Sequence, residues 1–247
     1  MKRRDFFKKA GVATAAGLGG LALLSSCDQG EKKDVSAPAV QKSKKTINVV
    51  STWPRDFPGL GLSAQRLAAR ITELSEGSLE VKYFAAGEKV GAFDVFDEVS
   101  SGNSQAYIAA EYYWKGKHAA FNYFTSVPFG MTTVEWNAWI KFGGGQKLWD
   151  DLSGEFGLKA LPCGGTGTQA GGWFNKEINS AADLQGLKFR MPGFGGKALG
   201  LTGASVQNVP GGEIYQALAS GSIDGAEWIG PFADERLGFQ EICKFYY

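Results

Sequence analysis

An α/β fold with mostly parallel sheets is predicted by two stretches in which strand patterns alternate with helical patterns. The first stretch runs from Thr46 to Ala110 and the second from Leu187 to Pro231. Parallel neighbouring strands need a crossover connection, usually a helix, so this alternation is typical of parallel sheets. The 35 glycines of the chain fit the many tight strand-to-helix turns of such a fold.

The first stretch contains three predicted strands, at 46–51, 79–84 and 106–110, because these segments are apolar or alternate apolar and polar residues. A helix is expected between the first two strands, with Gly77 after its end. Its apolar residues recur at helical spacing: Leu62, Leu67, Ile71 and Leu74. A second helix is expected at 92–100, with Phe93, Phe96 and Val99 on one face.

Aromatic residues are dense between Glu111 and Phe129. One interpretation is that they pack in the core and its loops. The alternative is that Tyr112 or Tyr113, which directly follow a predicted strand, line a pocket.

A capping box at Thr132–Glu135 predicts the start of a helix that runs to about Asp151. The glycines at 143–145 should weaken or break this helix. The residues expected to face inward are Trp136, Trp139, Ile140 and Leu148. The glycine-rich segment 157–174 matches neither a Walker A loop nor a dinucleotide fingerprint, so it is predicted to be a long strand that kinks between two domains.

The second stretch begins after a short helical turn capped by Ser180 and Asp183. Strands are expected at 187–192 and 223–228. A helix at 212–220 should place Tyr215 and Leu218 inward and end at Gly221.

Composition excludes several functional classes. A formal net charge of +1, without a basic face, argues against a nucleic-acid partner. The single histidine, His118, and the absence of a CxxC pattern exclude multi-histidine and cysteine-cluster zinc sites. No nucleophile–base pair stands out, so no catalytic residue is assigned and the protein is not expected to be an enzyme.

Arg190 and Glu227 are the two candidate poles of a small-molecule site, because each lies at the end of a predicted strand. Arg190 falls in an apolar segment, where a buried guanidinium must be paired. Its partner could be an acid of the protein or the carboxylate of a ligand, which the planar guanidinium can bind through two hydrogen bonds.

Glu227 would repel a bound carboxylate unless a proton, direct pairing with Arg190 or a bridging cation resolved the conflict. Hard cations prefer oxygen ligands. The candidate ligands are the Glu227 carboxylate, the Trp228 carbonyl and the side-chain oxygen of Gln169. Trp228 could equally be a core residue, or it could supply an apolar wall and an N–H donor.

The first 27 residues are predicted to be an export signal. Adjacent Arg3 and Arg4 precede a weakly apolar run, Ala10–Leu24, that is shorter than the roughly 20 apolar residues needed by a spanning helix. This pattern is typical of twin-arginine export. Leu24–Cys27 resembles a bacterial lipobox, so Cys27 is expected to carry lipid, although an ordinary signal with a nearby cysteine is the alternative. Asp28 resembles a signal for retention at the inner membrane.

Residues 28–45 are polar and charged, and they predict a flexible tether. The remaining cysteines, Cys163 and Cys243, could form a disulfide outside the cytoplasm. Because 44% hydrophobic residues can build a core without a disulfide, two buried thiols are expected instead.

The segments FNYFTSVPFGMTTVEW, FRMPG and YQALASGSIDGAEW, with the lipoprotein-like start, resemble the substrate-binding subunits of tripartite ATP-independent periplasmic (TRAP) transporters. The resemblance covers residues 46–247. Its Glu227–Trp228 pair is similar to the branch that binds 2-oxo acids and related hydroxy acids with a metal ion.

The resemblance implies a two-domain Venus-flytrap fold with a cleft between domain I at 46–166 and domain II at 167–247. Family members are usually longer, so the chain is expected to lack a return segment to domain I. Arg190 would clamp the ligand carboxylate. Gln169, Glu227 and Trp228 would lie near substrate and a Na⁺ or Ca²⁺ ion, with Tyr112 and Tyr113 as further pocket residues.

The implied function is capture of a small 2-oxo or 2-hydroxy monocarboxylate in the periplasm and its delivery to TRAP membrane subunits. Contact with the membrane would be only through the lipid on Cys27, and a homodimer is an open alternative to a monomer. The other functions considered are a ligand sensor for a signalling receptor, a dicarboxylate-binding protein and, least favoured, an exported lyase with Glu227 as its base.

Overall fold

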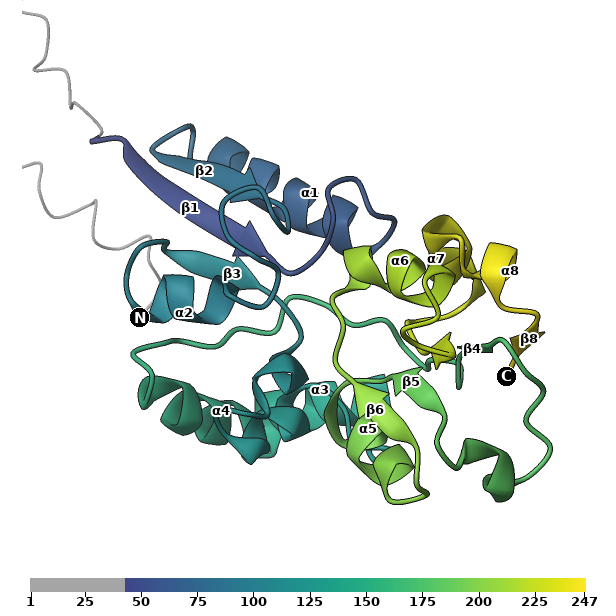
Figure 1. Cartoon of the computed structure of the whole chain (residues 1–247). Helices are drawn as coiled ribbons and strands as arrows, with labels where there is room; N and C mark the ends of the chain where they lie inside the picture. Colours follow the sequence, from purple (N-terminus) through teal and green to yellow (C-terminus); the bar gives the residue numbers. More distant parts are fainter. Residues whose placement is uncertain (1–42) are drawn as a thin grey trace, which may run out of the picture. The chain divides into compact units, whose positions relative to one another are not determined.

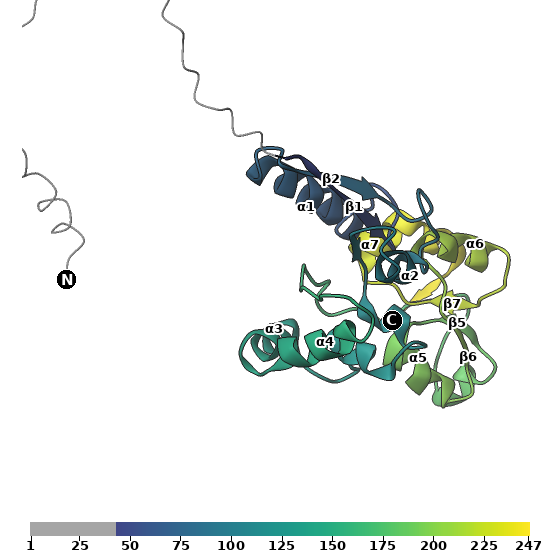
Figure 2. The same ribbon diagram turned by 90° about the vertical axis from the view of Figure 1, so that its left-hand side faces the viewer.

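A computed structural model of the chain describes residues 43–247, shown from two directions in Figures 1 and 2. The predicted export signal, Cys27 and most of the predicted tether lie outside the described residues. Within 43–247, no helix combines the length and apolar character needed to cross a membrane.

The first sheet has three parallel strands in the order β2-β1-β3. These strands are β1 (Lys45–Ser51), β2 (Leu79–Phe84) and β3 (Ala106–Ile108), and the crossover helices are α1 (Leu60–Leu74) and α2 (Val95–Ser100). Helix α1 lies along β1 and β2 in both views. The predicted alternation of strands and helices is therefore confirmed in this part of the chain.

The buried face of α1 consists of Gly61, Ala64 and Ala68, whereas Leu67 and Leu74 are exposed. Small residues allow a helix to approach its sheet closely, so the leucine spacing predicted the helix but did not identify the face in contact with the strands.

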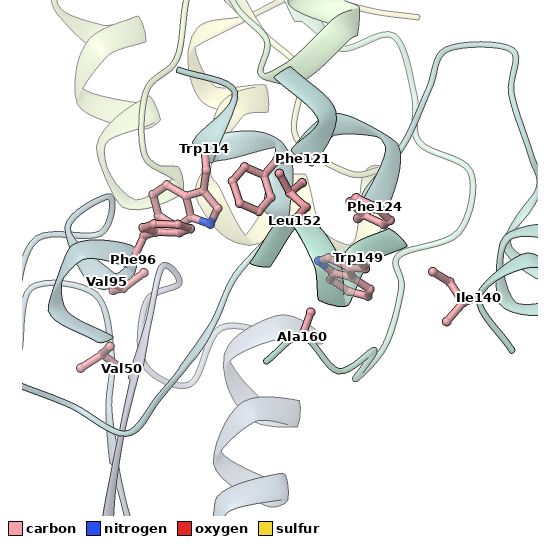
Figure 3. Packing of buried hydrophobic residues seen from close by; sticks show 10 residues of the cluster. All are labelled: Val50, Val95, Phe96, Trp114, Phe121, Phe124, Ile140, Trp149, Leu152 and Ala160. Atoms are coloured by element: carbon pink, nitrogen blue, oxygen red, sulfur yellow. The ribbon is translucent and has the colours of Figure 1, made fainter. Parts of the chain in front are cut away.

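The aromatic segment after β3 forms two short 3₁₀ helices, η1 (Glu111–Trp114) and η2 (Ala119–Phe124). Trp114, Phe121 and Phe124 are buried in a core cluster with Phe96 of α2. Figure 3 shows these side chains together with those from the following helices. The interpretation of these aromatics as core residues holds for these three.

Helices α3 (Thr133–Phe142) and α4 (Gly145–Gly154) replace the single helix expected up to Asp151. The Thr132–Glu135 capping box is present, and the break comes at Gly143 and Gly144, as the glycines predicted. Ile140 is buried, and Trp136 and Trp139 are half-buried against the core.

The inward orientation predicted for Leu148 is wrong. Leu148 is exposed, and its neighbour Trp149 packs in the core instead. The positive φ of Gly144 turns the chain before α4 begins, so the helical phase of α3 does not continue into α4.

The long strand predicted at 157–174 is also wrong. Only β4 (Trp173–Phe174) forms at its end, and the preceding residues from Leu158 have no helix or strand. Five of the residues between 164 and 172 are glycines, which pack poorly and lose more entropy than other residues when held in a strand.

The second sheet has five strands in the order β6-β5-β7-β4-β8. The strands β6 (Ser205–Gln207), β5 (Lys188–Arg190) and β7 (Gly225–Ala226) are parallel, and β4 and β8 (Phe245–Tyr246) are antiparallel to their neighbours. The prediction of mostly parallel sheets is confirmed, although β7 is shorter than the expected 223–228.

Helical segments flank or connect these strands, and they include the predicted short turn and the predicted helix near 212–220. They are η3 (Ala181–Leu184), α5 (Gly193–Gly200), η4 (Gly211–Glu213), α6 (Ile214–Ala219), α7 (Pro231–Asp234), η5 (Glu235–Leu237) and α8 (Phe239–Ile242). Leu218 of α6 is buried as predicted. Tyr215 is not: it is 39% exposed, and its hydroxyl donates a hydrogen bond to Glu241.

Both cysteines in the described part are free thiols. Cys243 is buried, but Cys163 is exposed, so the prediction of two buried thiols is wrong for Cys163. Cys163 lies in the segment that was expected to be a long kinked strand and that has no regular structure.

Candidate functional site

The three parallel strands of the second sheet end at one edge and bring Arg190, Asn208 and Glu227 to it. Arg190 ends β5, Asn208 follows β6, and Glu227 follows β7. The register places Arg190 opposite Gln207 on one side and opposite Ala226 on the other. Polar groups at the carboxyl ends of parallel strands are well placed to meet a ligand.

Arg190 is buried, with 1% of its surface exposed. Its Nη1 donates to the Glu227 carbonyl at 2.7 Å and to Glu227 Oε2 at 3.0 Å, and its Nε donates to the Val209 carbonyl. Nη2 is also buried but has no partner among the described residues. Of the two partners considered for Arg190, the structure places the protein acid beside it and leaves one nitrogen of the guanidinium for a further acceptor.

Glu227 is almost as buried as Arg190, and its carboxylate oxygen Oε1 has no partner within residues 43–247. Burial raises its pKa to about 7, the positive charge of Arg190 opposes that rise, and the carboxylate of Asp234 adds to it. A buried acceptor oxygen without a partner costs free energy, so a proton or a cation at Oε1 would stabilise this arrangement.

Trp228 forms an apolar wall over Arg190. The guanidinium carbon lies 5.0 Å from the centroid of the Trp228 ring, a cation–π geometry. Phe57, from the loop between β1 and α1, meets the ring edge-on at 5.9 Å. Trp228 is thus both a core residue and a wall of the site, and its Nε1 is a buried donor without a partner in the described part.

Gly211 makes the position of the Trp228 ring possible. A Cβ atom built on Gly211 would overlap the far edge of the indole. Any larger residue would therefore force the indole ring or η4 to shift.

The two tyrosines singled out in the sequence have different surroundings. Tyr112 lies against Gly193, and its pKa is raised by burial and, to a smaller extent, by Tyr113 and Glu227. Tyr113 packs on Phe93 at the edge of the first core cluster. The structure therefore brings Tyr112 close to the charged pair, whereas Tyr113 packs against the rings of Tyr112 and Phe93.

Gln169 is exposed, and its Nε2 donates to Thr166 Oγ1. No hydrogen bond joins Gln169 to Arg190 or Glu227 within the described residues. Its role as a ligand to the cation remains a prediction.

Two polar residues with free buried oxygens were missed in the sequence. The side-chain oxygens Oδ1 of Asn208 and Oγ1 of Thr52 are buried and have no partner among the described residues. Thr52 directly follows β1, as Asn208 follows β6. Their position in the sequence could have identified them, because each is the first residue after the end of a parallel strand.

A cation site can be tested against these donors. No cluster of three or more His, Cys, Asp or Glu side chains suited to a metal ion occurs in the part that the structure describes. Glu227 Oε1 and the Trp228 carbonyl are oxygen donors on adjacent residues, and hard cations readily take carbonyl, water and ligand oxygens besides carboxylates. The residues present fit a cation whose remaining ligands come from a bound oxyacid.

Comparison with protein families gives a match over residues 50–247 to the model of DctP, described as bacterial extracellular solute-binding protein, family 7. Among curated proteins, a monocarboxylate 2-oxoacid-binding periplasmic protein of Nostoc sp. strain PCC 7120 is 41% identical over 249 residues. That alignment covers 100% of this chain and 65% of the relative, so the chain spans about two thirds of its length.

Two solved structures are similarly close. A TRAP periplasmic solute-binding protein from Pseudoalteromonas atlantica T6c, with bound sodium and pyruvate, has 43% identity and a TM-score of 0.80. A homologue from Colwellia psychrerythraea, with bound calcium and pyruvate, has 43% identity and a TM-score of 0.79. Each match covers 83% of this chain and 62% of the solved chain.

Proposed function

The chain belongs to family 7 of the bacterial extracellular solute-binding proteins, and from that premise we propose that it captures a small 2-oxo or 2-hydroxy monocarboxylate together with Na⁺ or Ca²⁺. The relatives that bind pyruvate with sodium or calcium support this ligand class. Delivery to TRAP membrane subunits is part of the same proposal. Ligand binding for transport requires no catalytic group.

The observation that carries the proposal is the free Nη2 of Arg190. Nη1 and Nε are held by Glu227 and Val209, so the guanidinium is fixed before any ligand arrives. A buried charged donor without a partner is costly, and a ligand carboxylate would supply the missing acceptor. Preorganisation of this kind lowers the entropy cost of binding.

In the proposed geometry, the ligand is held by Arg190 and by a cation. The carboxylate would accept from Arg190 Nη2 on the second sheet. Glu227 Oε1 and the Trp228 carbonyl, with Gln169 as a further candidate, would hold a cation that also takes oxygens from the ligand. When bound, the cation neutralises the repulsion between the ligand and Glu227. Trp228 and Tyr112 would cover the apolar part of a small ligand.

Calorimetric titration of the purified protein tests the proposal. Pyruvate, a longer 2-oxo acid and a C4 dicarboxylate should each be titrated in Na⁺, in Ca²⁺ and in a choline buffer with chelator. We expect binding of the monocarboxylates in Na⁺ or Ca²⁺ and much weaker binding without a cation. A dicarboxylate that binds while the monocarboxylates do not would overturn the ligand class.

Export and anchoring complete the proposal. The relatives are described as periplasmic proteins, and twin-arginine export followed by lipidation of Cys27 would tether this protein to the inner membrane. The proposed tether would leave the domains free to reach the membrane subunits, and a homodimer remains an alternative assembly. Cys27→Ser should release the protein from the membrane fraction while leaving pyruvate binding intact.

A further inference from the structure

Asp234 is a second buried carboxylate near the site, and neither the sequence pattern nor the family comparison assigned it a role. It ends α7 and has no exposed surface. Its Oδ1 accepts from the backbone N–H groups of Ile229 and Gly230 at 2.9 and 3.0 Å, and its Oδ2 accepts from Trp173 Nε1 at 3.1 Å.

These three partners are all donors, which suits an ionised carboxylate. Burial raises the pKa of Asp234, while the same hydrogen bonds and the charge of Arg190 oppose that rise. A buried carboxylate that accepts several N–H groups is retained as an anion because the donors replace its lost hydration.

The hydrogen bond from Ile229 links Asp234 to a candidate cation ligand. The Ile229 N–H and the Trp228 carbonyl belong to one peptide group, and the described chain contains no cis peptide bond. In a planar trans peptide, the N–H and the C=O point in opposite directions. Asp234 therefore holds the N–H on one side, which fixes the direction of the carbonyl oxygen on the other.

The charges around this peptide are unbalanced. Arg190 contributes one positive charge, and the carboxylates of Glu227, paired with Arg190, and of Asp234, held by three N–H donors, each contribute a negative charge when ionised. Among residues 43–247, the hydroxyls of Tyr112 and Tyr246 also face Glu227 and Asp234, respectively, and both are neutral. A bound monocarboxylate would bring a second net negative charge. A divalent cation would cancel both, and a monovalent cation only one.

We propose that Asp234 is a positioning residue for the cation, which aims the Trp228 carbonyl through the shared peptide and adds the charge that favours Ca²⁺ over Na⁺. The inference rests on the proposed function, because it concerns the cation of the same site. The two roles of Asp234 can be distinguished by measurement. Orientation of the carbonyl affects the affinity for both ions, whereas the charge of Asp234 affects the affinity for a divalent ion more strongly.

The test is the binding of Ca²⁺ and of Na⁺, each titrated by calorimetry against the purified protein at fixed pyruvate, with Ca²⁺ also titrated alone. Asp234→Asn should weaken Ca²⁺ binding by about 10- to 100-fold, the usual effect of removing a group that orients a metal ligand. Because Coulomb energy scales with ionic charge, the charge contribution should reduce the affinity for Na⁺ by only about half as many log units.

A second measurement, of pyruvate affinity without a cation, distinguishes this role from simple damage to the fold, because here the variant is not expected to lose affinity. In a choline buffer with chelator, pyruvate should bind Asp234→Asn as well as or better than the wild type, since one negative charge that repels the carboxylate has gone. A variant that merely misfolds would lose this binding as well.

Two control variants separate charge from geometry. Glu235→Gln removes the exposed charge of the next residue and should change neither affinity. Trp173→Phe removes one hydrogen-bond donor to Asp234 but keeps the negative charge of Asp234, so the preference for Ca²⁺ over Na⁺ should persist. Should the new amide of Asp234→Asn conflict with Trp173 Nε1 and impair folding, the double variant with Trp173→Phe removes that conflict and supports the same comparison.

If Asp234→Asn lost the same affinity, in log units, for Ca²⁺ and for Na⁺, the role of the charge would be overturned. If both affinities were unchanged, the whole inference would be overturned. Failure of the proposed function has a different signature: the wild-type protein itself would bind neither pyruvate nor a cation.

Discussion

At the scale of single residues, ligand recognition is expected to depend on the planar shape of Arg190 more than on its charge. The guanidinium binds Glu227 and Val209 with two of its nitrogens, and the third has no partner in the described part of the chain. A lysine could keep the positive charge, but it could not satisfy the Val209 carbonyl, Glu227 and a ligand with the same fixed geometry.

Arg190→Lys should therefore weaken pyruvate binding by about 2 kcal/mol or more, roughly 30-fold in Kd. Calorimetric titration measures the change. Arg70→Lys is the matched control, because Arg70 is an exposed arginine on α1 that pairs with Glu73. Wild-type affinity in Arg190→Lys would remove the guanidinium from the proposed site.

Glu111 predicts a pH dependence of stability that is separate from the site. It is buried, it accepts a hydrogen bond from the Tyr107 hydroxyl, and its Oε2 has no partner among the described residues. Burial raises its pKa from 4.5 to about 7. The folded state thus keeps its proton at a pH where the unfolded chain has lost it, so stability falls as pH rises from about 4.5 to about 7.

Glu111→Gln removes this dependence. Relative to the wild type, the variant should gain stability between pH 5 and pH 8, by an amount on the order of 3 kcal/mol. Denaturant unfolding at the two pH values measures the difference. Glu155→Gln, at an exposed position in the same part of the chain, should show no such gain. Parallel stability–pH curves for Glu111→Gln and the wild type would contradict the assignment.

At the scale of elements, the site depends on how closely η4 approaches the end of β7. Gly211 lets η4 lie against the Trp228 ring, and that ring covers Arg190. The position of the ring is set by backbone packing between these two elements together with the edge-on contact from Phe57.

Gly211→Ala should displace the Trp228 ring and weaken pyruvate binding by about tenfold, in line with the 1–3 kcal/mol typical of overpacking. Tryptophan fluorescence and calorimetry report the two effects. Gly212→Ala is the control, because its added methyl would only reach ordinary contact distance from Pro54. A shifted ring without loss of affinity would show that Trp228 is not a wall of the ligand site.

At the scale of the whole molecule, closure around the ligand is the expected motion. Arg190 and Glu227 lie on the second sheet, whereas Tyr112 and Phe57 come from the part of the chain that forms the first sheet. A ligand that contacts both groups favours the closed arrangement over an open one by its difference in affinity. The domain boundary at 166/167 and the flytrap motion remain predictions.

Small-angle X-ray scattering should show a smaller radius of gyration after addition of pyruvate with Ca²⁺. Arg190→Ala should show no compaction at the same concentrations, because the ligand would lack its carboxylate clamp. A radius unchanged in the wild type, despite binding measured by calorimetry, would exclude closure as the response to ligand.

Local patterns in the sequence were sufficient for the order and type of most elements. The capping box at Thr132, the glycine break near Gly144 and the strand–helix alternation on both sides depend on propensities over a few residues. The same locality explains why Arg190 and Glu227 could be identified, since each is a charged residue that follows an apolar strand pattern.

Tertiary structure alone decided which groups are shared and which remain free. Contacts between distant segments pair one oxygen of Glu227 with Arg190 and place Asp234 against the peptide that follows Trp228. They also bury Trp149 and leave Leu148 exposed. Strand register and the phase of each helix fix these contacts, and neither is encoded in a short stretch of residues. The sequence thus determined the two charged strand ends. Only the tertiary structure determined that, within residues 43–247, one nitrogen of Arg190 and one carboxylate oxygen of Glu227 are left unpaired.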